Sequence, residues 1–207
     1  GNFGISGNFS FYPTKQITTG EGGMVISNDK KFIGKIKKFK AFGIDTPPEA
    51  RKKEGVYDVL SLGYNYRMTD FQAALGVGQM KRYSMNVEKR RLNAKLYSEI
   101  LNDNKNIYFP KYNKDSSFFL FQIILDDKIN RDNVINALRE SGIGFSIHYA
   151  TPVPLMSYYK NKYNYDTQDF PNALSYANSS LSLPVHPKLT KSDIEYICRV
   201  LKKITED

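Results

Sequence analysis

The chain has 207 residues, of which 41% are hydrophobic and 14% aromatic, and its formal net charge is +9. This composition is typical of a folded globular protein and excludes a disordered one, and no apolar run approaches the roughly 18 residues of a membrane-spanning helix. The single cysteine, Cys198, excludes a disulfide framework and a cysteine-based zinc site, and no metal-ligand pattern is visible, so we expect no metal, no membrane partner and a reducing, cytoplasmic setting.

The first part of the chain predicts two strands, a helix and a long loop. Residues 7–12 and 22–27 are short apolar runs around a glycine-rich turn, which is typical of paired strands. Apolar residues recur at helical spacing in residues 29–43, so we expect a helix that is capped at its C-terminal end by Gly43. Residues 44–68 predict a long loop, and loops of that length in compact domains are usually functional or mobile.

The strongest helical signal runs from residue 69 to residue 101. Thr69 and Gln72 have the spacing of a capping box at its start. The apolar stripe of this segment is supplied by Phe71, Ala74, Leu75, Gly78, Leu92, Leu96 and Ile100. We expect a long helix, bent near Ser84, that is long enough to link two domains.

The remaining residues predict a compact α+β unit. Strands are expected at residues 107–110, 117–125 and 143–149, and helices at residues 130–142, 171–179 and 190–204. The last of these helices begins with a cap formed by Thr190 and Asp193.

Lys15 follows an apolar run and precedes a turn rich in threonine and glycine. A lysine amine becomes a nucleophile that forms Schiff bases when partial burial or nearby positive charge favours its neutral form. Ser10 provides a hydroxyl close by, and residues 17–23 provide further hydroxyls and unhindered backbone N–H groups, which are components of an anion-binding site. The residue types alone leave two interpretations open: a lysine that binds a phosphate-bearing aldehyde, and a solvated lysine in an ordinary glycine turn.

Two long motifs resemble the active-site region of the DegT/DnrJ/StrS sugar aminotransferases. They are "FSFYPTKQITTGEGGMVISND" (9–29) and "GYNYRMTDFQAALGVGQM" (63–80), and "GIGFSIHYATPVPLMSYY" (142–159) resembles the C-terminal domain of the same family. The resemblance implies an α/β fold of the aspartate-aminotransferase type (type I). Residues 1–68 are then the end of the large cofactor-binding domain, residues 69–104 a linking helix region, and residues 105–207 a small C-terminal α+β domain.

The resemblance also implies a cofactor, pyridoxal 5'-phosphate (PLP). Lys15 matches the lysine that binds PLP through a Schiff base, and Ser10 matches the hydroxyl that binds its phosphate. Asn65 matches an asparagine that reaches the phosphate of the neighbouring subunit's cofactor, which implies a homodimer with shared active sites.

Three residues are candidates for substrate binding. His148 matches a histidine near the sugar-nucleotide pocket, and Arg67 is a candidate to contact a phosphate or carboxylate across the dimer. Tyr12 and Pro154 stand where many family members have histidines, which leaves the substrate subclass open. The presence of Lys15 argues against the related sugar dehydratases, in which histidine replaces it.

These matches predict transfer of an amino group from an amino-acid donor, by analogy glutamate, to a nucleotide-linked keto sugar in surface or secondary polysaccharide biosynthesis. Family members carry further cofactor ligands in roughly another half-chain upstream, so we expect these residues alone to be inactive. One alternative is a catalytically incomplete or regulatory relative of this fold. Another is a basic nucleic-acid-binding protein, but the positive charge in residues 29–40 and 81–95 is not accompanied by a docking motif, so we expect no nucleic acid.

Overall fold

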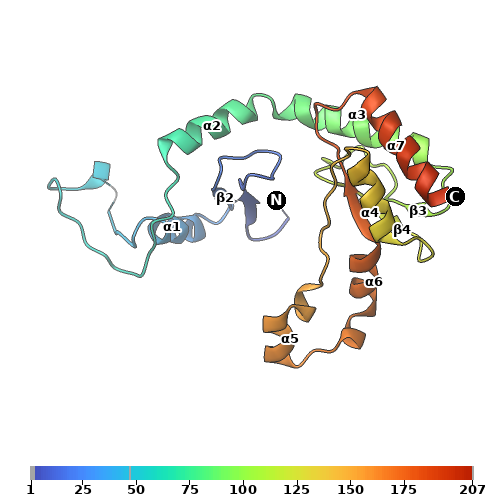
Figure 1. Cartoon of the computed structure of the whole chain (residues 1–207). Helices are drawn as coiled ribbons and strands as arrows, with labels where there is room; N and C mark the ends of the chain where they lie inside the picture. The colour runs from blue at the N-terminus through green and yellow to red at the C-terminus, as the bar shows by residue number, and fades with distance from the viewer. Residues whose placement is uncertain (1–2, 47, 207) are drawn as a thin grey trace. The chain divides into compact units, whose positions relative to one another are not determined.

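The computed structural model describes residues 3–46 and 48–206. The chain forms two compact units, Gly1–Tyr83 and Ser84–Asp207 (Figure 1). The division falls within residues 69–104, the predicted linking region. The expectations that involve residues 1, 2, 47 and 207, which are domain ends and one loop position, lie outside the described residues.

The first unit is built on an antiparallel pair of strands, β1 (Gly7–Ser10) and β2 (Gly23–Ile26). It also contains α1 (Lys30–Phe39), the short 3-10 helix η1 (Pro48–Ala50) and α2 (Asp70–Met80). Both predicted strands and the helix after them are confirmed. The predicted helix end is wrong, because α1 stops at Phe39 and its C-cap is Lys40 rather than Gly43.

Gly43 lies instead where two backbone segments cross. Its φ is +72°, and a Cβ on it would come within 1.8 Å of the Ser61 carbonyl oxygen. A Cβ on Gly63 would come within 2.0 Å of the Gly43 nitrogen. Only glycine permits this approach at both positions. The crossing brings the two ends of the long loop together and so fixes the segment that carries Asn65 and Arg67.

The predicted single helix over residues 69–101 is wrong, because the segment forms α2 and a separate helix, α3 (Tyr83–Leu101). The N–H of Arg82 donates to the carbonyl of Gln79 at 3.0 Å, and this tighter bond ends α2. The glycines of the preceding turn lower its helix propensity. The interruption therefore comes just before the bend that was expected near Ser84.

The second unit contains an antiparallel sheet in the order β3-β4-β5. Its strands are β3 (Ile107–Tyr108), β4 (Phe121–Leu125) and β5 (Ser180–Leu183). Its helices are α3, α4 (Arg131–Glu140), α5 (Ser157–Tyr163), α6 (Pro171–Ser179) and α7 (Lys191–Glu206), with 3-10 helices η2 (Val153–Leu155) and η3 (Thr167–Asp169). The predicted elements at residues 107–110, 117–125, 130–142, 171–179 and 190–204 are confirmed, with ends that differ by a few residues.

Helices α3, α4 and α7 gather around this sheet and form one hydrophobic core with it (Figure 1). The core side chains that are fully buried include Ala94, Tyr97, Leu101, Ile123, Val134, Leu138, Leu181, Ile194, Cys198 and Leu201. Burial raises the pKa of the Cys198 thiol to about 12, so this cysteine acts as an inert part of the core.

The predicted strand at residues 143–149 is wrong. Only Ser146 pairs, as an isolated antiparallel bridge to Ser182 on β5. Gly142 has a φ of +68° and turns the chain away from α4. A hollow of about 580 Å³ opens beside this bridge, lined by residues 142–146, the end of β5 and the start of α7.

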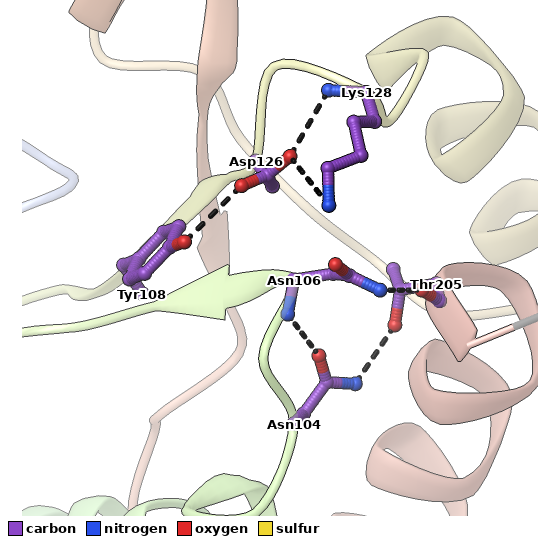
Figure 2. A network of polar contacts seen from close by, with 6 residues as sticks. All are labelled: Asn104, Asn106, Tyr108, Asp126, Lys128 and Thr205. Carbon is purple, nitrogen blue, oxygen red and sulfur yellow. Dashed lines mark hydrogen bonds and ion pairs between the residues drawn. The ribbon is translucent and has the colours of Figure 1, made fainter.

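A polar network joins the C-terminal end of α7 to the start of the sheet (Figure 2). The Asn104 amide donates to the Thr205 hydroxyl at 2.9 Å, and the N–H of Asn106 donates to the Asn104 side chain at 2.9 Å. The Tyr108 hydroxyl donates to Asp126 at 3.1 Å, which ties β3 to the end of β4. Because Asn104 is buried, its own hydrogen bonds satisfy polar groups that would otherwise destabilise the unit.

Candidate active site

The chain turns directly after β1, and this turn carries Lys15. The N–H of Lys15 donates to the Tyr12 carbonyl at 3.0 Å, and the N–H of Tyr12 donates to the Ser10 Oγ at 3.3 Å. All three side chains are exposed. The turn therefore holds a primary amine, a phenol and a hydroxyl together on one short segment of the first unit.

Residues 11–22, which we call the lysine loop, are closed by backbone hydrogen bonds at Phe11. The N–H of Phe11 donates to Gly22 at 2.8 Å, and its carbonyl accepts the N–H of Thr19 at 3.0 Å. Thr19 is buried at 4% exposure, and the Thr18 hydroxyl also donates to the Phe11 carbonyl at 3.1 Å. Phe11 therefore forms hydrogen bonds with residues after Lys15, and these bonds fix both ends of the loop. We call residues 11–14 its outgoing leg and residues 18–22 its returning leg.

The donor set of this loop fits a phosphorylated aldehyde. Ser10 uses an oxygen lone pair to accept the Tyr12 N–H, so its hydroxyl proton remains to donate to a phosphate. Lys15 provides an amine that reacts with an aldehyde once it is neutral. Among the side chains of the turn, these two groups therefore suit the two functional groups of PLP.

Asn65 and Arg67 follow the glycine crossing in the same unit. Asn65 is exposed, and its backbone forms an isolated antiparallel bridge with Ala41. The Arg67 guanidinium lies 5.0 Å from the centroid of the Phe42 ring, a cation–π contact that orients it. Arg67 also lines a groove of about 910 Å³ between β1, β2 and α1. Phe11, Glu21 and Gly22 of the lysine loop also line this groove, whereas Lys15 and Ser10 do not.

His148 belongs to the second unit, so its position relative to Lys15 is not defined. Its Nδ1 lies 3.2 Å from the Oγ of Ser182, a buried residue of β5. Its backbone carbonyl accepts a hydrogen bond from the Gln122 side chain at 3.2 Å. The imidazole is therefore fixed to the edge of the sheet through one ring nitrogen, and its Nε2 remains for another contact.

Two glutamines of α2 contact the lysine loop, and sequence reasoning missed both contacts. Gln72 was assigned only to the capping box, which the structure confirms with Thr69 at 3.2 and 3.1 Å. Its side chain also donates to the Glu21 carbonyl at 3.0 Å, and Gln79 bonds to Thr18. The available signal was the presence of polar residues in an otherwise apolar helix.

Residues 3–46 and 48–206 lack two further features. Nowhere in these residues do three or more His, Cys, Asp or Glu side chains form a group that could hold a metal ion. No helix in this part of the chain has both the length and the apolar character that crossing a membrane requires.

The fold is similar to that of solved sugar aminotransferases. The chain superposes on Helicobacter pylori PseC, an aminotransferase involved in the biosynthesis of pseudoaminic acid, with a TM-score of 0.90 and 29% identity, over 100% of this chain and 54% of that one. It superposes on the PLP form of the Streptococcus pneumoniae putative sugar aminotransferase Spr1654 with a TM-score of 0.86 and 25% identity, over 100% and 53%. The mixed α/β character of the prediction is confirmed.

Residues 1–202 match the DegT/DnrJ/EryC1/StrS aminotransferase family, and the chain belongs to this family. Among curated relatives, it is 35% identical over 204 residues to a Campylobacter jejuni UDP-4-amino-4,6-dideoxy-N-acetyl-beta-L-altrosamine transaminase, covering 96% of this chain and 52% of the relative. The chain spans about half the length of the curated relatives that it matches. The family resemblance predicted from the sequence motifs is therefore confirmed.

Proposed function

We propose that the protein is a PLP-dependent aminotransferase that acts on a nucleotide-linked keto sugar, with an amino acid, by analogy glutamate, as the donor. The observation that carries this proposal is the family match over residues 1–202, which includes Lys15 and its loop. The names of the similar proteins support both the substrate class and the cofactor, because one is a UDP-sugar transaminase and another was solved in its PLP form.

Within this proposal, Lys15 binds the cofactor covalently through its Nζ and Ser10 donates its hydroxyl proton to the cofactor phosphate. The cofactor supplies, when bound, an aldehyde carbon that reacts with amines and a ring that accepts negative charge. With cofactor and donor bound, the Nζ of Lys15 would be the base that takes a proton from the Cα of the donor. The same Nζ later delivers a proton to the sugar carbon that receives the amino group. The turn restrains the Lys15 backbone and so limits the region that its amine reaches in both transfers.

We propose that Asn65 completes the phosphate site of a second copy in a homodimer. Its side chain is exposed beside a glycine crossing that leaves little backbone freedom. If the sites are shared, Lys15→Ala and Asn65→Ala subunits that are each impaired should regain activity when mixed, because one site of the mixed dimer has both native residues. The absence of regain in dimers shown to be mixed would contradict a shared site.

We propose that His148, Tyr12 and Arg67 bind the substrate. All three have a polar or charged group that can donate a hydrogen bond, and Ser182 fixes the His148 ring. Losing one of these contacts should raise KM more than it lowers kcat, because none is assigned a proton transfer.

We also propose that residues 1–68 are the end of a large cofactor-binding domain and that residues 105–207 form the small α+β domain. Residues 69–104 are then the helical region that links the two. The confirmed family supports this division, and the continuous core of the second unit supports its last part.

The function is tested with a panel of UDP- and GDP-linked keto sugars, each offered with glutamate or another amino acid to the natural full-length protein. We expect one sugar to gain an amino group, seen as a mass change, and we expect Lys15→Ala to abolish the product. Lys81→Ala, on an exposed lysine outside the loop, is the matched control and should retain activity. Amination by Lys15→Ala at the normal rate would refute the assigned mechanism.

A further inference from the structure

Helix α2 packs against the rest of its unit through residues that are not apolar. Its partly buried residues are Gln72, Gly76 and Gln79, which share one face because they are four and three residues apart. We call these residues the α2 polar stripe. The apolar side chains Phe71 and Val77 are 85% and 59% exposed. A helix that packs to bury apolar surface turns such residues inward, so hydrophobic burial does not explain the contact made by this stripe.

The α2 polar stripe contacts the lysine loop along its returning leg. Gln79 Nε2 donates to the carbonyl of Thr18 at 2.8 Å, and Gln79 Oε1 accepts the N–H of Thr18 at 3.2 Å. One side-chain amide therefore satisfies both backbone polar groups of one residue, as a neighbouring strand would. Gly76 allows the close approach, because a Cβ there would lie 3.2 Å from Thr19 Cγ2. Gln72 adds the bond to Glu21 at the far end of the loop.

The place of this contact connects it to the reactive amine. The outgoing leg of the lysine loop is fixed because Phe11 continues from β1 and pairs with Gly22. The returning leg begins at Thr18, shortly after Lys15, and Thr18 is the residue that Gln79 holds through both backbone groups. Without Gln79, the loop would be anchored on that side by the bonds of Thr18 and Thr19 to Phe11. Gln79 therefore adds two hydrogen bonds to the part of the loop that follows Lys15.

We infer that Gln79 is a positioning residue for Lys15, and that the α2 polar stripe holds the lysine loop in the conformation that presents the amine to the cofactor. The inference rests on the proposed function, since it names the support of the same site. Gln79 acts through the Thr18 backbone and is assigned no contact with cofactor or substrate.

The first test measures backbone hydrogen exchange in the natural full-length protein without cofactor. Gln79→Met keeps a side chain of similar length and a good helix former but loses both hydrogen bonds. We expect exchange at Thr18 and Thr19 to become about tenfold faster, as expected for two ordinary hydrogen bonds. Gln79→Glu keeps an acceptor for the Thr18 N–H. We expect its exchange rates at Thr18 and Thr19 to lie between those of the unaltered protein and those of Gln79→Met. The matched control is Val77→Met, which adds the same side chain on the exposed face of α2.

The second test uses the protein with PLP and follows the pH midpoint of the cofactor absorbance. We expect Gln79→Met to move this midpoint by about 0.5 pH unit or more, because the surroundings of the Lys15 amine change, and we expect Val77→Met to leave it in place. A purely structural role would lower the melting temperature without moving the midpoint of the folded protein. A midpoint in Gln79→Met that equals that of Val77→Met would overturn the positioning role of Gln79, whether or not exchange at Thr18 and Thr19 is faster. If the unaltered protein binds no PLP at Lys15, the proposed function fails, and the exchange measurement still decides whether Gln79 holds the loop.

Discussion

Tyr97 connects α3 to the end of β5, the strand that holds His148 through Ser182. Its side chain is fully buried, its hydroxyl donates to the Pro184 carbonyl at 2.9 Å, and its ring stacks on Phe121 with centroids 4.8 Å apart. Tyr97→Phe keeps the stacked ring and removes only the hydroxyl. Because the partly buried carbonyl loses its donor, we expect the free energy of unfolding of the second unit to fall by about 1 kcal/mol. Tyr97→Ala also removes the ring and leaves a cavity, and we expect a loss of about 4 kcal/mol.

Tyr97 also predicts how the free energy of unfolding changes with pH. Burial raises the pKa of Tyr97 far above its ordinary value, so the folded state favours the neutral phenol. The stabilisation is complete below about pH 10, where the unfolded side chain is also neutral, and it is lost as the pH rises further. Tyr97→Phe has no such group. The unfolding free energies of the two proteins should therefore converge between about pH 10 and pH 11.

Urea unfolding followed by far-UV circular dichroism measures these differences, and hydrogen exchange at Ile123 and Leu181 assigns them to the second unit. Tyr112→Phe, at a tyrosine that is 38% exposed, is the matched control and should change stability by less than about 0.5 kcal/mol. If Tyr97→Phe is as stable as the unaltered protein at pH 8, or keeps the same loss above pH 10, the role assigned to the hydroxyl is refuted.

Three other experiments test local features of the two units. Thr69→Ala removes the capping box of α2 and should lower the local stability of that helix by about 1 kcal/mol, measured by hydrogen exchange, while Thr69→Ser should restore most of it. The raised pKa of the Cys198 thiol, about 12, predicts that a thiol reagent at pH 8 labels it only as fast as the second unit unfolds, and rapid labelling of the native protein would contradict its burial. Gly63→Ala places a Cβ against the Gly43 nitrogen and should speed tryptic cleavage of the long loop. Gly34→Ala, in open space on α1, should not, and equal cleavage rates would argue against the crossing.

Local patterns predicted those elements whose cause lies within a few residues. The capping box at Thr69, the apolar spacing of α4 and α7 and the glycine turn between β1 and β2 all appear where the sequence indicates them. Each depends on a hydrogen bond or an apolar face that short spacing alone specifies.

Several features that the sequence did not predict depend on a single glycine or on partners distant in sequence. Residues 143–149 have the composition of a strand, but the glycine at position 142 redirects the chain and only Ser146 finds a partner. The contact of Gln79 with Thr18 spans 61 positions, so no local pattern shows it. The apolar residues of α2 suggested an inward apolar stripe, whereas the polar residues face the loop.

The candidate site was predicted in part by chemistry and in part by resemblance. The residue types of the lysine loop allowed both a reactive and an ordinary turn lysine, and the structure adds that Ser10 and Lys15 share one hydrogen-bonded turn. The assignments of Ser10, Lys15 and Asn65 to PLP come from the resemblance and stay predictions, because each needs a bound cofactor or a second subunit to be seen.

The most direct test of the account is to find where PLP is attached. The natural full-length protein is loaded with PLP and reduced with borohydride, which makes a Schiff-base link permanent, and its peptides are then examined by mass spectrometry. The account predicts one pyridoxyl group on Lys15 and no comparable labelling of any lysine in Lys15→Ala. A label on another lysine, or an unaltered cofactor absorbance in Lys15→Ala, would contradict it.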